Sequence, residues 1–391
     1  MASRRDFIRS GAIATAAASA AGVMGARQAG AAAAPAVPGF PGDQSYAVTG
    51  PRAPWNQPQR KTDPISIDMH THWAPASYLK AKAELGKPDF LDPVNHDMER
   101  RKKLMEGMGI KSSVITLGGF RPWQWVTPEQ GARIAAGVND EAIAAHNANP
   151  GSFYFGIEVN CSDAAGSLKE LNRVAGKPGL VCLHLCTSLA GREFIFEPAF
   201  QPVLARAEEL GLPIWLHPLD GEPNWFAGHR LADVPSGVAA DADLTAGANR
   251  FPGLTNSLGN SLEIAVTIAK LISSGTLDKY PNLTFMAAHG GGAIPYVAGR
   301  LEGRGGGGRL KQPAHAYLRR FYYDAATYYV PSLRYLAEMV GADRIVLGTD
   351  NMYGPGDNQM TGQPHSLIDQ TFNDADRDLV LRGNLKRLFR I

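Results

Sequence analysis

The stretch SIDMHTHWAP, residues 66–75, starts as a short apolar run and carries two histidines, two positions apart, where the run ends. Side chains at positions i and i+2 of a β-strand project to the same face. If this run is a strand, His70 and His72 point together into one cavity. Parallel α/β folds place their sites at the carboxyl ends of strands, so the pair predicts a fold of that kind.

Short apolar runs recur along the rest of the chain, and amphipathic stretches of helical periodicity separate them. The eight runs are Ile65–His70, Ser113–Leu117, Phe153–Val159, Leu180–Leu185, Pro213–His217, Leu283–His289, Phe321–Thr327 and Arg344–Gly348. Strand followed by helix, repeated eight times, predicts a (β/α)₈ TIM barrel over residues 64–391. A doubly wound open sheet is the alternative fold. The first run is followed by no glycine-rich phosphate turn, which disfavours a dinucleotide-binding version of that sheet.

Ligand-type side chains stand at the ends of several of these runs. His217 ends the fifth run, His289 the sixth, and Asp350 follows the eighth. A single histidine at a strand end is more often a packed or surface group than a ligand, and an isolated H-x-H is a weak signal. Four strand ends that each supply such a residue are hard to explain by packing alone. Imidazole and carboxylate groups are the ligands of a catalytic Zn²⁺ or a comparable ion, so the pattern predicts a metal site.

The ordered segments DMHTH, HP, AHGGGAIPYVAGR and GTD resemble the metal-dependent amidohydrolase superfamily. The resemblance is to the branch of aminocarboxymuconate semialdehyde decarboxylase and γ-resorcylate decarboxylase, and it runs from about Ile65 to the closing GNLKRLF. It implies one divalent ion, with Zn²⁺ as the first choice and Mn²⁺ as the alternative. The implied ligands are His70, His72, His217 and Asp350. The implied acid–base residue beside the metal is His289, with Asp350 also relaying a proton.

The resemblance implies a decarboxylase, a carbon–carbon lyase, that acts on a small unsaturated or aromatic carboxylate. A divalent ion that orients oxygens, beside an acid–base histidine, would also suit hydrolysis of an ester, lactone or amide, so a hydrolase is the alternative. A metal-binding protein without turnover is a third class. The non-ligand His289 argues against it, because a pure binder does not need such a residue.

Other residues are assigned by the resemblance or left open. Arg300 stands eleven positions after His289, where the related decarboxylases carry an arginine that reaches the neighbouring subunit's site and grips a substrate carboxylate. This role predicts a homodimer or higher oligomer; the alternative is a surface arginine near a helix end. Trp73 is predicted to contact substrate. Asp324 either orients a ligand or accepts structural hydrogen bonds, and we favour the structural role.

The chain also departs from the family pattern. Between Trp73 and Asp97 it carries lysines but no arginine, where the aminocarboxymuconate enzymes place a second substrate-gripping arginine. The aminocarboxymuconate substrate is therefore disfavoured.

The N-terminus reads SRRDFIRS and continues into an uncharged run rich in alanine and glycine. Paired arginines before a weakly hydrophobic run are typical of a twin-arginine export signal. We assign residues 1–35 to this signal and the Pro- and Gly-rich residues 36–63 to a linker or arm. The expected location is the periplasm or the exterior of the cell.

Composition excludes several classes of partner. The formal net charge is only +2, from 39 basic and 37 acidic side chains, and no basic stripe with interleaved aromatic residues is present, which argues against nucleic acid. No strongly apolar segment is long enough for a membrane span. The three cysteines form no disulfide framework. Cys182 and Cys186 would lie about 13 Å apart on one strand, so core packing is expected there.

Overall fold

A computed structural model describes residues 65–86, 97–118, 121–189, 192–218, 258–304, 310–350 and 364–391. The predicted export signal, residues 1–35, and the predicted linker, residues 36–63, lie outside the described residues. Among the residues described, no helix combines the length and the apolar composition that a membrane crossing requires.

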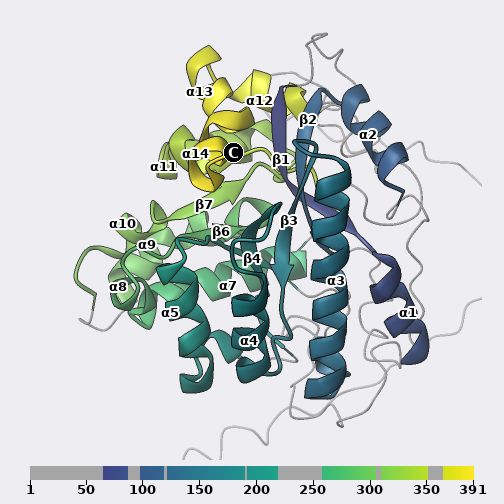
Figure 1. Ribbon diagram of the computed structural model, residues 1–391. Coiled ribbons are helices and arrows are strands. Elements are labelled where there is room, and N and C mark those ends of the chain that lie inside the picture. Colours follow the sequence, from purple (N-terminus) through teal and green to yellow (C-terminus); the bar gives the residue numbers. More distant parts are fainter. Residues whose placement is uncertain are drawn as a thin grey trace, which may run out of the picture. The chain divides into compact units, whose positions relative to one another are not determined.

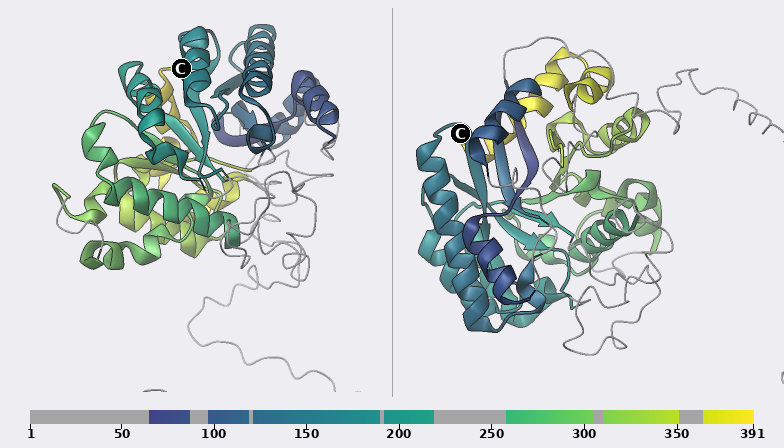
Figure 2. Two further views of the ribbon diagram at one scale, coloured as in Figure 1. Left: turned by 90° about the horizontal axis from the view of Figure 1, so that it is seen from below. Right: turned by 90° about the vertical axis from the view of Figure 1, so that its right-hand side faces the viewer.

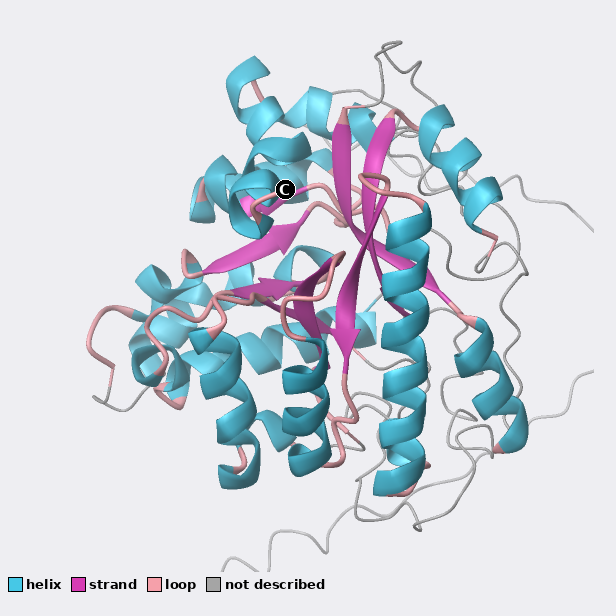
Figure 3. Ribbon diagram, viewed as in Figure 1, coloured by secondary structure: helices cyan, strands magenta, loops and turns pink. Residues whose placement is uncertain are grey.

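Eight parallel strands form one sheet, and each strand pairs with the next along the chain (Figures 1 and 3). Two backbone hydrogen bonds join the first strand to the chain after the eighth, Met69 N to Leu347 O at 2.9 Å and Asp350 N to His70 O at 2.8 Å. The predicted (β/α)₈ barrel is thereby confirmed as a nearly closed barrel. The strands are β1 (Ser66–Trp73), β2 (Ile110–Leu117), β3 (Phe153–Glu158), β4 (Leu180–Cys186), β5 (Ile214–His217), β6 (Phe285–Ala287), β7 (Phe321–Asp324) and β8 (Ile345–Val346).

Helices follow the strands and lie on the outside of the barrel (Figure 2). Local sequence explains where the longest of them begins: Thr127 and Gln130 form a capping box, and Pro128 occupies the first helical position. The helices are α1 (Ala76–Glu84), α2 (Met98–Gly107), α3 (Pro128–Ala148), α4 (Ala164–Val174), α5 (Gln201–Glu209), α7 (Asn260–Ser273), α8 (Thr276–Lys279), α9 (Ile294–Arg304), α10 (Ala314–Leu318), α11 (Val330–Val340), α12 (Pro364–Thr371), α13 (Asp374–Asp378) and α14 (Asn384–Phe389).

Two hydrophobic clusters hold the barrel together. The larger cluster packs strands against the surrounding helices. The smaller one, which includes Met69, Cys182 and Trp215, draws on all eight strands once the half-buried Tyr154 of β3 is counted. Such a cluster fills the inside of a barrel with side chains. Cys182 therefore packs in the core, as predicted, and all three cysteines are buried free thiols.

Candidate metal centre

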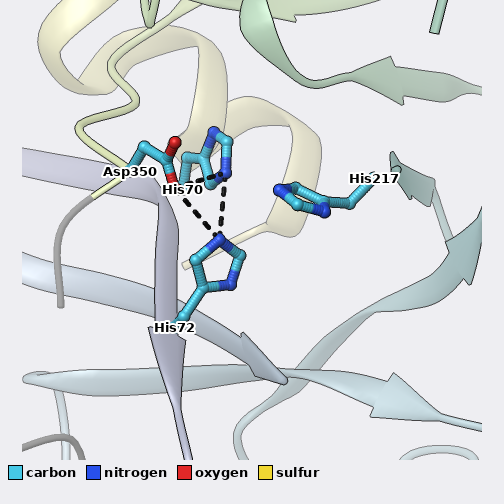
Figure 4. Close-up of side chains that lie close together, drawn as sticks. All are labelled: His70, His72, His217 and Asp350. Carbon is cyan, nitrogen blue, oxygen red and sulfur yellow. Dashed lines mark hydrogen bonds and ion pairs between the residues drawn. The ribbon is translucent and has the colours of Figure 1, made fainter. Parts of the chain in front are cut away.

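The structure brings His70, His72, His217 and Asp350 together at the carboxyl end of the barrel. All four are buried, and each offers one ligand atom within 4.8 Å of the others. The Nε2 atoms of His70 and His72 lie 3.2 Å apart, and Asp350 Oδ1 lies 3.3 Å from the first and 3.2 Å from the second. Figure 4 shows the His217 ring pointing at this group from the side of β5.

An irregularity in β1 aims its two histidines at this centre. The pairing of β1 with β2 advances by three residues on β1, from Asp68 to Thr71, and by two on β2. An extra residue in a strand changes which face the following side chains occupy. Ile67, before the bulge, packs inside the barrel, and His70 and His72, after it, also point inward. In a regular strand, side chains three positions apart, such as those of Ile67 and His70, would lie on opposite faces.

Asp350 reaches the centre through an unusual backbone conformation. Its φ angle is 55°, in the left-handed region that few residues other than glycine adopt. Neighbouring contacts hold it there: the amide of Asp350 donates to His70 O, and both the amide and the hydroxyl of Thr349 donate to the buried carboxylate of Asp68. Burial is the largest influence on that carboxylate, and it raises the pKa of Asp68 to about 7 against these hydrogen bonds.

Asp324, at the end of β7, lies beside His70. Its Oδ2 accepts a hydrogen bond from His70 Nδ1 at 2.5 Å, and its Oδ1 accepts from the amides of Gly290 and Ala326 at 2.8 and 3.1 Å. A carboxylate only accepts hydrogen bonds, so Nδ1 of His70 carries the proton and Nε2 faces the centre. Asp324 thus orients a ligand-type histidine and also anchors the backbone around His289. Asp324 therefore has both of the roles considered from the sequence, orienting a ligand and accepting structural hydrogen bonds.

His217 shows most directly that the cluster fits a cation. Its Nδ1 lies 2.7 Å from the carbonyl oxygen of Pro218, so Nδ1 carries the proton and Nε2 presents a lone pair. That Nε2 is buried and has no hydrogen-bond partner within the described part of the chain. Burial and the neighbouring His72, His70 and His289 hold the pKa of His217 well below its ordinary value. A buried neutral imidazole whose free nitrogen faces three other ligand-type atoms suits a divalent metal.

The charges around the centre also favour a cation. Burial alone would lower the pKa of His70, but the carboxylates of Asp350, Asp324 and Asp68 raise it to about 9. Burial would raise the pKa of Asp350, whereas His70, His289 and His72 hold it well below its ordinary range. The carboxylates therefore draw positive charge into the cluster. A divalent ion supplies that charge and releases the imidazole proton when it binds.

His289 stands next to the cluster. Its Nε2 lies 3.6 Å from Asp350 Oδ2, and 10% of its side chain is exposed. The backbone at His289 has a φ angle of 55°, and the three glycines that follow also have positive φ angles. The last of them, Gly292, has no room for a side chain, because a Cβ there would lie 1.8 Å from the carbonyl oxygen of Ser261. The HGGG sequence is thus needed to turn the chain between β6 and α9.

A cavity of about 590 Å³ opens from His289 and Asp350 and runs between α9 and α11. Its walls include Tyr296, Tyr328 and Tyr335. A concave, largely apolar space beside convergent polar groups is typical of a small-molecule site. The predicted acid–base residue therefore faces a space that a substrate can enter.

Two predicted substrate residues lie elsewhere. Arg300 is exposed on α9, one turn after Tyr296, and does not line this cavity in its own subunit. Trp73 is 4% exposed and packs in the core, with its ring 4.7 Å from that of Phe155. Their substrate contacts stay predictions.

Sequence reasoning missed a buried charged network beneath His217. Arg121 donates to His217 O at 2.9 Å and to His184 Nε2 at 3.0 Å, and His184 Nδ1 donates to Glu158 at 2.6 Å. The side chains of Arg121, His184 and Glu158 are all buried. Burial and Arg121 lower the pKa of His184 to about 4, so this histidine is neutral. A clue in the sequence is the charged Glu158 at the end of an otherwise apolar strand, because a buried charge needs a partner.

Comparison with known proteins agrees with this geometry. A family model described as amidohydrolase matches residues 67–391. The chain belongs to the amidohydrolase family. The resemblance predicted from the motifs, and with it the prediction of an enzyme, is confirmed.

The relatives of this amidohydrolase include decarboxylases. The 2-amino-3-carboxymuconate-6-semialdehyde decarboxylase of Dictyostelium discoideum is 22% identical over 357 residues, which cover 82% of this chain and 90% of that protein. The γ-resorcylate decarboxylase of Rhizobium radiobacter is 23% identical over 354 residues, which cover 83% of this chain and 98% of that protein.

A solved structure shares the fold. It is that of a dihydroxybenzoic acid decarboxylase from Polaromonas sp. JS666, with bound manganese and the inhibitor 2-nitroresorcinol. The two chains superpose with a TM-score of 0.65 at 21% identity, and the match covers 83% of this chain and 96% of that one. This likeness shows the (β/α)₈ fold.

Proposed function

We propose that this amidohydrolase is a metal-dependent decarboxylase that acts on a small aromatic or unsaturated carboxylate. The observation that carries the proposal is His289: a non-ligand histidine lies 3.6 Å from a ligand-type carboxylate and lines a cavity large enough for a small acid. Two relatives that are named as decarboxylases of such acids support the proposal.

In this proposal His70, His72, His217 and Asp350 hold one divalent ion, Zn²⁺ or Mn²⁺. When bound, the ion acts as a Lewis acid that orients substrate oxygens and disperses negative charge. The manganese bound in the Polaromonas structure supports a divalent ion that accepts imidazole and carboxylate ligands. Asp324 keeps Nε2 of His70 directed at the ion.

The residues of the chain move the proton. Decarboxylation breaks the bond between a substrate carbon and its carboxylate carbon, leaves the electron pair on the substrate carbon, and releases CO₂. That carbon then takes up one proton. His289 Nε2 and Asp350 Oδ2 lie 3.6 Å apart and both residues line the cavity, so a small movement or one bridging water would let them exchange a proton. We assign them the acid–base role, with Asp350 relaying the proton to carbon and His289 replacing it.

Metal content and CO₂ release test this proposal together. We expect about one divalent ion per chain in the purified protein and its loss in His217→Ala and Asp350→Ala. His289→Asn should keep the ion and lose CO₂ release by about 100-fold or more. Full CO₂ release by His289→Asn would exclude the acid–base role of His289. Hydrolysis of esters and lactones, without CO₂ release from any acid, would exclude the proposed decarboxylation.

We further propose that Arg300 completes the site of a neighbouring subunit, so that the enzyme is a homodimer or larger. Its exposure on α9, outside its own cavity, supports this placement. Mixing inactive Arg300→Ala with inactive His289→Asn tests it. Mixed dimers contain one site with both residues intact, so activity should return after subunits exchange. A monomeric protein, or no recovery in confirmed mixed dimers, would exclude the shared site.

Export by the twin-arginine route is also our proposal, supported by the paired Arg4 and Arg5 ahead of the apolar run. Cell fractionation of the full chain beside Arg4→Lys/Arg5→Lys tests it. We expect periplasmic or secreted protein for the natural sequence and retention of the double variant. Equal export of both would argue against this route.

A further inference from the structure

The buried charged network beneath His217 takes no part in the chemistry proposed above, yet it reaches the metal centre. Arg121 makes the connection, because one of its guanidinium nitrogens donates to His217 O at 2.9 Å. The ring of the same histidine donates from Nδ1 to the carbonyl oxygen of Pro218 at 2.7 Å. Two hydrogen bonds, one at the backbone and one at the ring, therefore define the direction in which His217 Nε2 points.

The direction of every hydrogen bond in the network follows from Arg121. A guanidinium group only donates, so Nε2 of His184, 3.0 Å from Arg121 Nη1, must accept. The proton of the neutral His184 ring then lies on Nδ1, which donates to Glu158 Oε1 at 2.6 Å. The network is thus a directed chain of hydrogen bonds from Arg121 through His184 to Glu158.

Glu158 anchors the far end of this chain in the barrel. Its Oε1 also accepts from the amide of Leu117, at the end of β2, at 2.9 Å. Asn139 of α3 fixes its backbone: Asn139 Nδ2 donates to Glu158 O at 2.8 Å, and Glu158 N donates to Asn139 Oδ1 at 2.9 Å. Since β2, β3, β4 and β5 are successive neighbours in the sheet, the chain ties His217 of β5 to the three strands beside it.

The charges within the network balance. Arg121 is positive at any ordinary pH. Burial alone would raise the pKa of Glu158, but His184 and Arg121 bring it below its ordinary value, so the carboxylate is negative. One cation and one anion, joined through a neutral imidazole, add no net charge beside the metal centre, where an unpaired cation would repel the ion. The network therefore suits a geometric role.

We propose that Arg121 is a positioning residue for the metal site. It holds the backbone of His217 so that Nε2 faces the ion, and His184 and Glu158 hold Arg121 in place. A ligand that is fixed before the ion arrives needs no rearrangement when the ion binds, which strengthens binding. This inference rests on the metal site of the proposed function and adds to it residues that do not touch the ion.

The double variant Arg121→Met/Glu158→Gln tests the inference, because it removes both buried charges and leaves neither without its partner. Titration of the metal-free protein with Mn²⁺, followed by calorimetry, measures the affinity. The visible absorption spectrum of the Co²⁺-loaded protein reports the arrangement of the ligands. We expect Mn²⁺ binding that is weaker by about 10- to 100-fold and a changed Co²⁺ spectrum. The net charge of the network is unchanged, so an effect of charge alone predicts neither result.

Two further variants keep the test decisive where the double variant does not fold. Arg121→Lys retains the charge, but an ammonium group lacks the planar fork that reaches two acceptors, so Mn²⁺ affinity should again fall, by about 10-fold. His184→Gln should restore natural behaviour, because its amide accepts from Arg121 and donates to Glu158.

Arg320→Met is the matched control. Arg320 donates to the carbonyl oxygens of Leu277, Tyr280 and Pro281, so its loss removes backbone hydrogen bonds of the same kind. It stands directly before β7, at the amino end of that strand, whereas the metal centre lies at the carboxyl ends. The Tm should fall in this variant, and the Mn²⁺ affinity and Co²⁺ spectrum should stay unchanged.

The outcomes separate this inference from the proposed function. Unchanged affinity and spectrum in the Arg121 variants, whatever their Tm, would show that Arg121 only stabilises the fold and would overturn the inference. Either change without the other, or His184→Gln as impaired as Arg121→Lys, would also overturn it. The expected changes, with no CO₂ from any acid in the natural protein, would overturn decarboxylation and support the inference. A natural protein that binds no metal would overturn both.

Discussion

The carboxylate of Asp324 decides which nitrogen of His70 faces the metal centre. One oxygen accepts the Nδ1 proton of His70 at 2.5 Å, and the other accepts two backbone amides. All of these contacts need an acceptor. An amide in place of the carboxylate can satisfy the backbone or the histidine, but not both, because its nitrogen only donates.

Asp324→Asn should therefore weaken metal binding by about 10- to 100-fold while the barrel still folds. Titration of the metal-free protein with Mn²⁺, followed by calorimetry, measures the affinity. Asp343→Asn is the matched control, since Asp343 is a partly exposed carboxylate that pairs with Arg319 in the turn before β8, whereas Asp350 follows that strand. Equal affinity of the natural protein and Asp324→Asn would mean that Asp324 has only the structural role.

At the scale of elements, β8 is very short, and the chain that follows it packs between β1 and β7. A Cβ added to Gly348 would lie 2.6 Å from the Cβ of Asp324 and 3.0 Å from that of His70. The absence of a side chain at Gly348 lets the chain ends of β1, β7 and β8 approach closely. The same approach brings Asp350 to the histidines of β1.

Gly348→Ala should lower the free energy of unfolding by about 1–3 kcal/mol, because the methyl group forces its neighbours apart. Metal affinity should fall with it, since both neighbours belong to the metal centre. Urea unfolding and Mn²⁺ titration measure the two effects. Gly303→Ala on α9 is the control: nothing lies within 4 Å of its added Cβ, so stability should stay level or rise by up to about 1 kcal/mol. Wild-type behaviour of Gly348→Ala would contradict this account of how the strands close.

The sequence predicted two kinds of feature in this enzyme: the repeated strand–helix pattern and the residues at the carboxyl ends of strands. His217 and Asp350 were predictable because parallel strands bring their carboxyl ends to one face, whatever the length of chain between them. The bulge in β1 was not, since it depends on pairing with β2. Arg121 was also missed: it follows a strand as an ordinary loop arginine would, and only packing shows that it lies buried against His184 and His217.

At the scale of the whole molecule, two buried neutral histidines make the fold sensitive to acid. Burial and Arg121 lower the pKa of His184 to about 4, and burial and Arg377 do the same for His365. In the unfolded chain both regain a value near 6.5. Between pH 6.5 and pH 4 the unfolded state therefore binds more protons than the folded state, and stability falls as the pH falls.

We expect this loss to be roughly 3 kcal/mol for His184 across that range. Thermal unfolding at a series of pH values measures it. His184→Gln should flatten the profile, because glutamine donates to Glu158 and accepts from Arg121 without titrating. His315→Gln, which replaces an exposed histidine, should leave the slope unchanged. A slope that is the same in His184→Gln as in the natural protein would show that other groups cause the acid sensitivity.

Metal binding should stabilise the entire barrel, because the predicted ligands come from both ends of the strand order. His70 and His72 stand on β1, His217 on β5 and Asp350 after β8. An ion that binds only when these strands are assembled adds its binding free energy to that of folding. At a free metal concentration 100 times the dissociation constant, the gain is about 2.7 kcal/mol.

Chelation with EDTA should therefore lower the Tm, and added Mn²⁺ or Zn²⁺ should restore it in a concentration-dependent way. His217→Ala provides the control, since this variant lacks one ligand and should show a Tm that neither EDTA nor metal changes. We also expect unfolding to stay cooperative. The metal should shift the single unfolding transition as a whole, because its removal releases ligands on β1, on β5 and after β8 together. A metal-induced shift that persists in His217→Ala would place the stabilising ion at another site, and no shift in the natural protein would contradict a metal centre that links these strands.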